Sequence, residues 1–206
     1  MRVNGTGNYT HSKLVVIATG AKELERTHIF YKGEEAKFKN IKESENAGIV
    51  IIHQELTMIP ELSITENIFL GNEIVKNGLI DWDLARQKTV ALLERVGLNL
   101  NPNTLIKNLG VGQQQLVEIA KALSKNVKLL ILDEPTSALN EDDSANLLEL
   151  MRDLKSKDIT CIMISHKLNE IAAISDGVTV IRDRCFGYYR GINSRYEVWK
   201  SILESR

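Results

Sequence analysis

Leu129-Leu130-Ile131-Leu132-Asp133-Glu134-Pro135-Thr136 is the stretch that decides the fold class of this chain. Its four leading apolar residues predict a buried strand, and Pro135 ends that strand because proline has no N–H to donate to a neighbour. The strand therefore carries two adjacent carboxylates, Asp133 and Glu134, to its carboxyl end. A strand that ends in this way is also found where a chain merely enters a solvated turn, so the flanking sequence must decide between the two interpretations.

Strands and helices alternate after this stretch. The apolar pattern predicts strands over residues 127–132, 159–164 and 178–181 and helices over residues 141–155 and 167–174. Apolar, β-branched strands separated by helices are typical of a parallel sheet that is covered by helices. Residues 184–190 abandon the pattern.

The residues before this stretch are mainly helical in character. Residues 49–52 predict a buried strand that ends at His53-Gln54-Glu55, and Ser63 with Glu66 matches a capping box at the start of a short helix. Amphipathic helices follow over residues 81–96 and 113–124. In the first of these helices, the expected buried face holds Leu84, Ala91, Leu92 and Val96. We therefore expect an α-helical subdomain over about residues 60–125.

Composition excludes several classes of function. The 206 residues carry a net charge of −1, so the chain lacks the basic surplus of a nucleic-acid-binding protein. The longest apolar runs, residues 14–18 and 129–132, are far shorter than the roughly 20 residues that cross a bilayer. Cys161 and Cys185 show neither metal-ligand spacing nor a disulfide pattern. These features predict a reduced, cytoplasmic protein without nucleic-acid partners, which reaches a membrane only through another protein.

Polar residues follow three of the predicted strands. Phosphoryl transfer from ATP to water needs a bound magnesium ion, an oriented water and donors around the γ-phosphate. Asp133 is placed to hold the magnesium shell, Glu134 can polarise the water, Gln54 can bind the metal or its water, and His166 ends a third strand. We expect all four at one sheet edge, where open α/β folds bind ligands. Taken alone, His166 is more typical of a satisfied residue at a strand boundary than of a functional one, and Gln54 is almost uninformative.

Two glycines stand at the start of the helix over residues 113–124. Gly110 and Gly112 free backbone amides to approach an anion, which the helix dipole also favours. The alternative interpretation is a flexible helix entry, because a Gly-x-Gly pair alone is weakly specific.

Together, these segments resemble, in their order, the motifs of ATP-binding-cassette (ABC) ATPases. Residues 59–71 and 117–123 are most similar to the ATP-binding subunits of bacterial sugar importers of the ribose, galactose and xylose type, and the xylose type is the preferred match. The resemblance spans residues 29–183. It implies an α/β, P-loop-NTPase-like nucleotide-binding domain, with a mostly parallel sheet, flanking helices and the α-helical subdomain.

The resemblance also assigns roles to residues. It makes Gln54 the start of the Q-loop, residues 109–113 the signature segment, residues 137–140 the D-loop, Asp133 and Glu134 the Walker B pair and His166 the switch histidine. It implies Glu134 and His166 as catalytic residues, Gln54 and Asp133 as magnesium ligands, and ATP contacts from Gln54, Gly110, Val111, Gly112, Gln113 and Asn140. Gly110 and Val111 depart from the usual Leu-Ser-Gly-Gly-Gln.

One family motif is missing from the sequence. Nowhere is there the Gly-x-x-x-x-Gly-Lys-[Ser/Thr] loop that cradles phosphates, and Gly5-Thr6-Gly7 and Gly20-Ala21-Lys22 echo it without its spacing. We therefore expect an incomplete domain over residues 29–183 between unmatched segments 1–28 and 184–206, as in a truncated or frameshifted gene product, with impaired catalysis.

The resemblance implies partners and a location as well. The partners are transmembrane sugar permease subunits and a second ABC cassette, and the location is the inner face of the cell membrane, reached through the permease. Two rival hypotheses remain: a non-catalytic module that docks on a permease, and a poorly folded relic.

Overall fold

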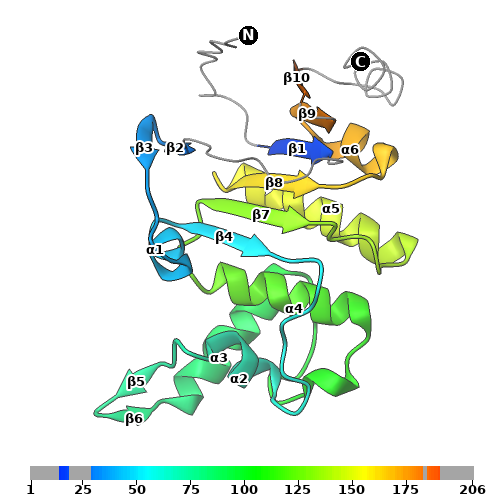
Figure 1. Ribbon diagram of the computed structural model, residues 1–206. Coiled ribbons are helices and arrows are strands. Elements are labelled where there is room, and N and C mark those ends of the chain that lie inside the picture. Colours follow the sequence, from blue (N-terminus) through cyan, green and yellow to red (C-terminus); the bar gives the residue numbers. More distant parts are fainter. Residues whose placement is uncertain (1–13, 19–28, 183–184, 191–206) are drawn as a thin grey trace.

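The computed structural model describes residues 14–18, 29–182 and 185–190. It confirms the predicted α/β fold, since helices pack against a six-stranded sheet with the order β10-β9-β1-β8-β7-β4 (Figure 1). The sheet strands are β1 (Leu14–Ala18), β4 (Ile49–Ile52), β7 (Leu129–Asp133), β8 (Thr160–Ile164), β9 (Gly177–Arg182) and β10 (Cys185–Arg190). Neighbouring strands run parallel, apart from the antiparallel pair β9 and β10.

Both ends of the chain contribute a strand to this sheet. β1 pairs in parallel with β8 on one side and β9 on the other. β10 continues the sheet although residues 184–190 were expected to abandon the pattern, and its Phe186, Tyr188 and Tyr189 are residue types that favour strands. The rest of the two unmatched segments, including Gly5-Thr6-Gly7 and Gly20-Ala21-Lys22, lies outside the described residues.

The two faces of the sheet are covered to different extents. Ile52, Leu132 and Met163 are in register across β4, β7 and β8, and each is at most 3% exposed. The neighbouring row, Ile51, Ile131 and Ile162, points to the opposite face, where Ile51 is 51% exposed and the other two are half-buried. One face therefore carries the core, while the other is only partly covered.

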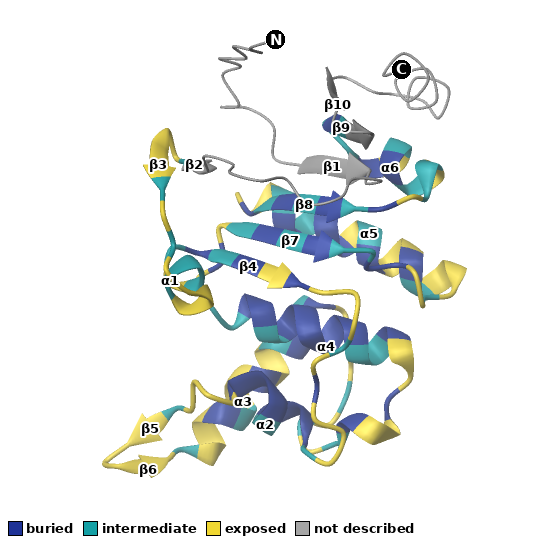
Figure 2. Cartoon of the chain, viewed as in Figure 1, coloured by how far each residue is buried: buried dark blue, intermediate teal, exposed yellow. Residues whose placement is uncertain are grey.

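Six α-helices and one 3₁₀-helix are described. They are α1 (Ile41–Asn46), α2 (Ile64–Phe69), α3 (Trp82–Arg95), η1 (Ile106–Asn108), α4 (Val111–Leu123), α5 (Glu141–Ser156) and α6 (Leu168–Ile174). α5 packs on β8, and α4 packs against α2, α3 and β4. The burial colours of Figure 2 show α4 as a mostly buried helix beneath the sheet. Within the described part of the chain, no helix is long and apolar enough to span a membrane.

Two short hairpins complete the fold. β2 (Ile29–Tyr31) pairs with β3 (Glu34–Ala36), and β5 (Val75–Lys76) pairs with β6 (Leu79–Ile80). The second hairpin interrupts residues 60–125, which were expected to be entirely helical. Its turn residues, Asn77 and Gly78, have φ angles of 53° and 83°, and Asn-Gly is the preferred pair for such a turn.

The predicted buried face of α3 is right only in part: Val96 is buried and Leu92 packs against the core, as predicted, but the rest of the buried stripe differs. Ala85, Thr89 and Leu93 are buried, whereas Leu84 is 38% exposed. Thr89 satisfies its hydroxyl by donating to the carbonyl oxygen of Ala85 at 2.9 Å. A polar residue thus occupies the middle of the buried stripe, and a pattern that counts only apolar residues misses it.

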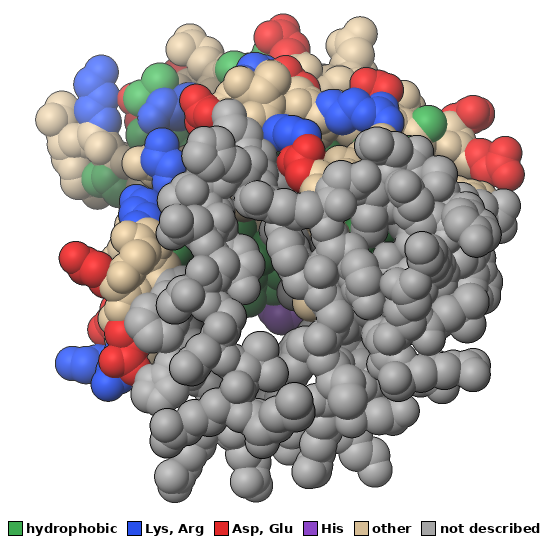
Figure 3. Space-filling view, turned by 90° about the horizontal axis from the view of Figure 1, so that it is seen from above, with side chains coloured by type: hydrophobic (Ala, Val, Ile, Leu, Met, Phe, Trp, Pro, Cys, Tyr) green, Lys and Arg blue, Asp and Glu red, His purple; other side chains and the backbone are tan. Residues whose placement is uncertain are grey.

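Charged side chains of both signs are interspersed over the described part of the face seen in Figure 3. Several pair along a helix, such as Lys157 with Asp153 at 2.7 Å. Pairs with this exposure stabilise a protein only slightly, by about 0.3–0.5 kcal/mol for i,i+4 spacing.

Candidate functional site

The register of the parallel strands gathers the predicted site residues at one sheet edge. Ile52 pairs with Leu132, and Asp133 pairs with Ile164, so β4, β7 and β8 end side by side. Gln54 therefore follows β4 next to the Asp133-Glu134 pair, and His166 follows β8 on its other side. The four residues come from three different strand ends.

Glu134 and His166 are in direct contact. Nδ1 of His166 lies 2.9 Å from both carboxylate oxygens of Glu134, and its geometry suits a hydrogen bond to Oε1. Because an ionised carboxylate only accepts, Nδ1 carries the proton, which leaves Nε2 facing away from the pair. Oε2 of Glu134 is buried and receives no hydrogen bond from the described residues. The pair thus presents one imidazole nitrogen and one unused carboxylate oxygen.

The backbone at Glu134 explains how this contact forms. Its φ angle is 49°, in the left-handed region that is uncommon outside glycine. Its N–H donates to the carbonyl oxygen of Ile164 at 2.9 Å, which extends the ladder between β7 and β8 by one step. The chain then turns sharply at Pro135. Such left-handed residues concentrate at functional sites, where neighbouring contacts hold them.

Asp133 and Gln54 are the candidate magnesium ligands. The Asp133 side chain is half-buried and makes no hydrogen bond with a described residue, so its oxygens are free to bind a hard cation. Gln54 is exposed beyond the end of β4. The described residues contain no cluster of three acidic, histidine or cysteine ligands. Asp133 and Gln54 as a ligand set fit Mg²⁺, which usually binds one or two carboxylates and takes its remaining ligands from water and phosphate.

The signature segment forms the start of α4. Gly110 caps the helix and donates its N–H to Oε1 of Gln113 at 3.2 Å, while Val111 is 47% exposed. Gly112 is buried, and a Cβ there would lie 2.4 Å from Oδ2 of Asp143 in the first turn of α5. A side chain at position 112 would therefore require the Asp143 side chain to rotate or the two helices to move apart.

The signature segment is not joined to the Glu134–His166 pair. Among the described residues, no hydrogen bond or ion pair connects Gly110, Gly112 or Gln113 with Glu134 or His166. Asn140, at the end of the predicted D-loop, uses its side-chain Oδ1 to accept the N–H of Asp143 at 2.8 Å. Its described contact is thus a helix cap, and its side-chain N–H groups point to no described partner.

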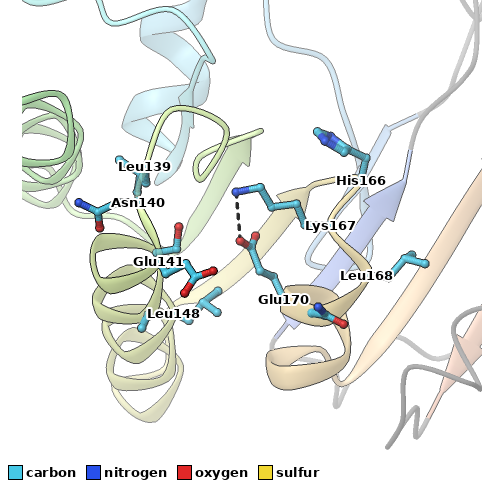
Figure 4. Close-up of a pocket in the computed structure, with 11 residues that line it drawn as sticks. Leu139, Asn140, Glu141, Leu148, His166, Lys167, Leu168 and Glu170 are labelled. Carbon is cyan, nitrogen blue, oxygen red and sulfur yellow. Dashed lines mark ion pairs between the residues drawn. The ribbon is translucent and has the colours of Figure 1, made fainter.

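A pocket of about 630 Å³ opens between the first turns of α5 and α6. Asn140, Glu141, His166 and Lys167 are among its lining residues, and Figure 4 shows the side chains of Lys167 and Glu170 pointing toward each other. His166 extends to the other side of the loop in this view. The pocket therefore adjoins the Glu134–His166 pair.

Sequence reasoning missed Glu118. This residue is 5% exposed on α4, and its Oε1 accepts both the N–H of Thr57 at 3.2 Å and the hydroxyl of Thr57 at 2.7 Å. The contact fixes the segment after Gln54 to the helix that begins with the signature. An acidic residue on the apolar side of an amphipathic helix is the signal that could have revealed it.

The sequence is similar to known proteins along most of its length. The family model for the ABC transporter matches residues 3–137. This span includes most of the segment 1–28, which we expected to be unmatched. The L-arabinose transport ATP-binding protein AraG of Geobacillus stearothermophilus is 58% identical over 182 residues, or 87% of this chain. The xylose import ATP-binding protein XylG of Moorella thermoacetica is 53% identical over the same share. The chain spans 35% and 36% of the length of these two proteins.

Solved structures share the fold. The ADP conformation of MJ1267, an ATP-binding cassette of an ABC transporter, superimposes with a TM-score of 0.74 at 20% identity, covering 93% of this chain and 85% of that one. CbiO1 from Clostridium perfringens, part of the ABC transporter complex CbiONQ, gives 0.73 at 20% identity, with 94% and 82% covered.

Proposed function

Because the chain belongs to the ABC transporter family, as its motifs predict, we propose that it is part of the ATP-binding subunit of a sugar importer. In such a subunit, ATP binding and hydrolysis drive the uptake of a carbohydrate. The similarity to an arabinose transport protein and a xylose import protein supports the substrate class. The observation that carries the proposal is the contact between Glu134 and His166 at the end of β7, beside the uncommitted carboxylate of Asp133.

The proposed chemistry divides the work among four residues. Asp133 and Gln54 would hold Mg²⁺, whose charge offsets that of the phosphates. Glu134 orients the attacking water and accepts its proton. An ionised carboxylate within hydrogen-bonding distance of a water can serve as such a general base. His166 keeps Nδ1 on Glu134 and thereby orients the carboxylate that receives the proton of the water. Because the signature segment makes no described hydrogen bond or ion pair with this pair, it fits a role in binding the ATP that is held by a second cassette.

The sequence supplies only part of a phosphate site. It lacks the loop whose amides and lysine bind the β- and γ-phosphates. Each charge-assisted hydrogen bond contributes about 1.5–3 kcal/mol, so losing two weakens ATP binding roughly 10²- to 10⁴-fold. We infer that the lone chain hydrolyses ATP poorly and depends on a partner cassette.

An ATPase assay with Mg²⁺ tests this proposal. The wild type and Glu134→Gln are compared alone and after mixing with an intact cassette, because Gln keeps the volume of Glu but cannot accept the proton of the water. We expect near-background turnover by the wild type and by Glu134→Gln when each is assayed alone. We expect turnover by the mixture to depend on the presence of this chain. Rapid turnover by the lone wild type would contradict the impairment. Absence of any effect on the partner would contradict the role of the signature segment.

A groove on the side of α4 supports a second function, docking on a transmembrane permease. It has a volume of about 650 Å³ between α1, the end of α2 and the end of α4, and Lys42, Lys121 and Lys125 line it. Lys125 is paired with Glu45 at 2.7 Å, whereas no hydrogen bond or ion pair is described for the ammonium of Lys121. Burial, together with the nearby charge of Lys125, lowers the pKa of Lys121. An acidic segment of a permease would relieve this unbalanced charge and hold the chain at the inner face of the cell membrane.

Co-purification with permease subunits tests the docking function. We expect Lys121→Glu to abolish co-purification and Lys128→Glu, an exposed lysine outside the groove, to retain it. Co-purification of the wild type while ATPase activity stays at background would favour a non-catalytic docking module. Equal capture of the two variants would contradict docking through this groove.

A further inference from the structure

A hydrogen-bonded clamp joins the turn after β7 to the first turn of α6. The Thr136 side chain is fully buried, and its hydroxyl donates to Oε2 of Glu170 at 2.6 Å. The carbonyl oxygen of the same threonine accepts the ammonium of Lys167 at 2.6 Å. Lys167 and Glu170 in turn form an ion pair at 3.4 Å, drawn as a dashed line in Figure 4. Three residues therefore close a ring of contacts.

The clamp spans the two loops that present the candidate catalytic pair. Thr136 lies two residues after Glu134, and Lys167 directly follows His166. Between these loops the backbone supplies one further link, the N–H of Glu134 to the carbonyl oxygen of Ile164 at 2.9 Å. The clamp is thus the side-chain connection nearest to the point where Glu134 meets His166.

His166 has little packing of its own. Its side chain is 74% exposed, whereas those of Lys167 and Glu170 are 33% and 13% exposed. An exposed imidazole cannot be oriented by its surroundings, so its position depends on the loop that carries it and on its contact with Glu134. A shielded ion pair that also binds a buried threonine is better suited to fix that loop.

We propose that Lys167 and Glu170 are positioning residues, which hold the turn at Thr136 against α6 and thereby keep Glu134 in contact with His166. The inference rests on the proposed function for the chemistry of the pair. The geometry itself needs no nucleotide. Loosening the clamp leaves both catalytic side chains in the protein but separates the loops that carry them.

Nuclear magnetic resonance of the imidazole ring tests the clamp in the nucleotide-free chain. With ¹⁵N-labelled histidine, the His166 signals are assigned by their loss in His166→Gln. We expect the wild type to show the hydrogen-bonded Nδ1–H signal and Glu134→Ala to lose it. Thr136→Val keeps the shape of the buried side chain but removes the hydroxyl, and it should lose the same signal, as should Glu170→Ala.

The control is Glu141→Ala, which removes an acidic side chain of the same pocket that has no described contact with the clamp. This variant should keep the Nδ1–H signal. Retention of the signal in folded Thr136→Val and Glu170→Ala, with unfolding transitions like that of the wild type, would overturn the proposal. Loss of the signal in Glu141→Ala as well would also overturn it. Failure of the proposed function would instead appear as absent ATPase activity in mixtures while the ring signals behave as expected.

Discussion

Replacing Gly112 with alanine tests how the signature segment is seated. A Cβ at this position would lie 2.4 Å from Oδ2 and 2.7 Å from Cγ of Asp143, well inside normal contact distance. The Asp143 side chain must therefore rotate, or α4 must move away from α5. Gly110, two residues earlier, has open space around it and an ordinary φ of −66°, so Gly110→Ala creates no clash and costs only the difference between glycine and alanine as an N-cap.

The magnitude follows from two opposing effects. Overpacking of this kind costs about 1–3 kcal/mol, while alanine gains up to about 1 kcal/mol over glycine inside a helix. We expect Gly112→Ala to lower the free energy of unfolding by about 0–2 kcal/mol. In an Asp143→Ala background only the 3.3 Å contact with the Cβ at position 143 remains, and the same substitution should be close to neutral. The coupling energy between the two positions should therefore be about 1–3 kcal/mol.

Urea unfolding, followed by circular dichroism, measures this double-mutant cycle. Asp143→Ala alone should cost about 0.3–1 kcal/mol, because it removes a negative charge from the first turn of α5. The m-values should agree among all variants, so that differences in midpoint report stability. An equal cost of Gly112→Ala in both backgrounds would refute the packing argument.

Three further predictions concern the rest of the fold. Ile52→Ala should lower the free energy of unfolding in urea by about 2–5 kcal/mol and Ile51→Ala by less than about 1 kcal/mol, because the two side chains are 3% and 51% exposed. Equal losses would contradict the difference between the two sheet faces. Ser63→Ala should cost about 1 kcal/mol near neutral pH by removing the helix cap. Hydrogen bonds from the Ser63 hydroxyl and N–H lower the pKa of Glu66 from 4.5. The ionised carboxylate therefore stabilises the fold above pH 4.5, and this effect is lost as the pH falls through the lowered pKa. If the difference in unfolding free energy between wild type and Ser63→Ala did not narrow in urea melts below pH 4.5, this role of Glu66 would be contradicted. Burial raises the pKa of Cys161 to about 12. Iodoacetamide at about pH 8 should therefore leave this thiol unmodified until the chain is unfolded, as measured by peptide mass analysis. Rapid modification of the folded chain would show that the strand is accessible.

Local signals predicted much of the framework. The strand at residues 129–133 ends where its carboxylates and Pro135 indicate, and the capping box of Ser63 and Glu66 is present with both hydrogen bonds. Such features depend on neighbours in sequence. The hairpin at Asn77-Gly78 also had a local signal, but the helical pattern on both sides concealed it.

The contacts that build the site depend on distant residues. Thr136 and Glu170 are 34 positions apart, and Thr57 and Glu118 are 61 positions apart. No periodicity relates such pairs, because strand order and register bring them together. The resemblance to ABC ATPases named Glu134 and His166 separately, while only the parallel pairing of β7 and β8 shows how they reach hydrogen-bonding distance.

The affinity of the chain for ATP with Mg²⁺ is the most direct test of the central claim, that the chain holds the carboxylate side of an ABC nucleotide site without its phosphate loop. Isothermal titration calorimetry should compare it with the full-length arabinose transport ATP-binding protein AraG of Geobacillus stearothermophilus under identical conditions. We predict binding about 10²- to 10⁴-fold weaker for the lone chain, from the loss of two or more charge-assisted phosphate contacts. Equal affinity of the two proteins would contradict the claim.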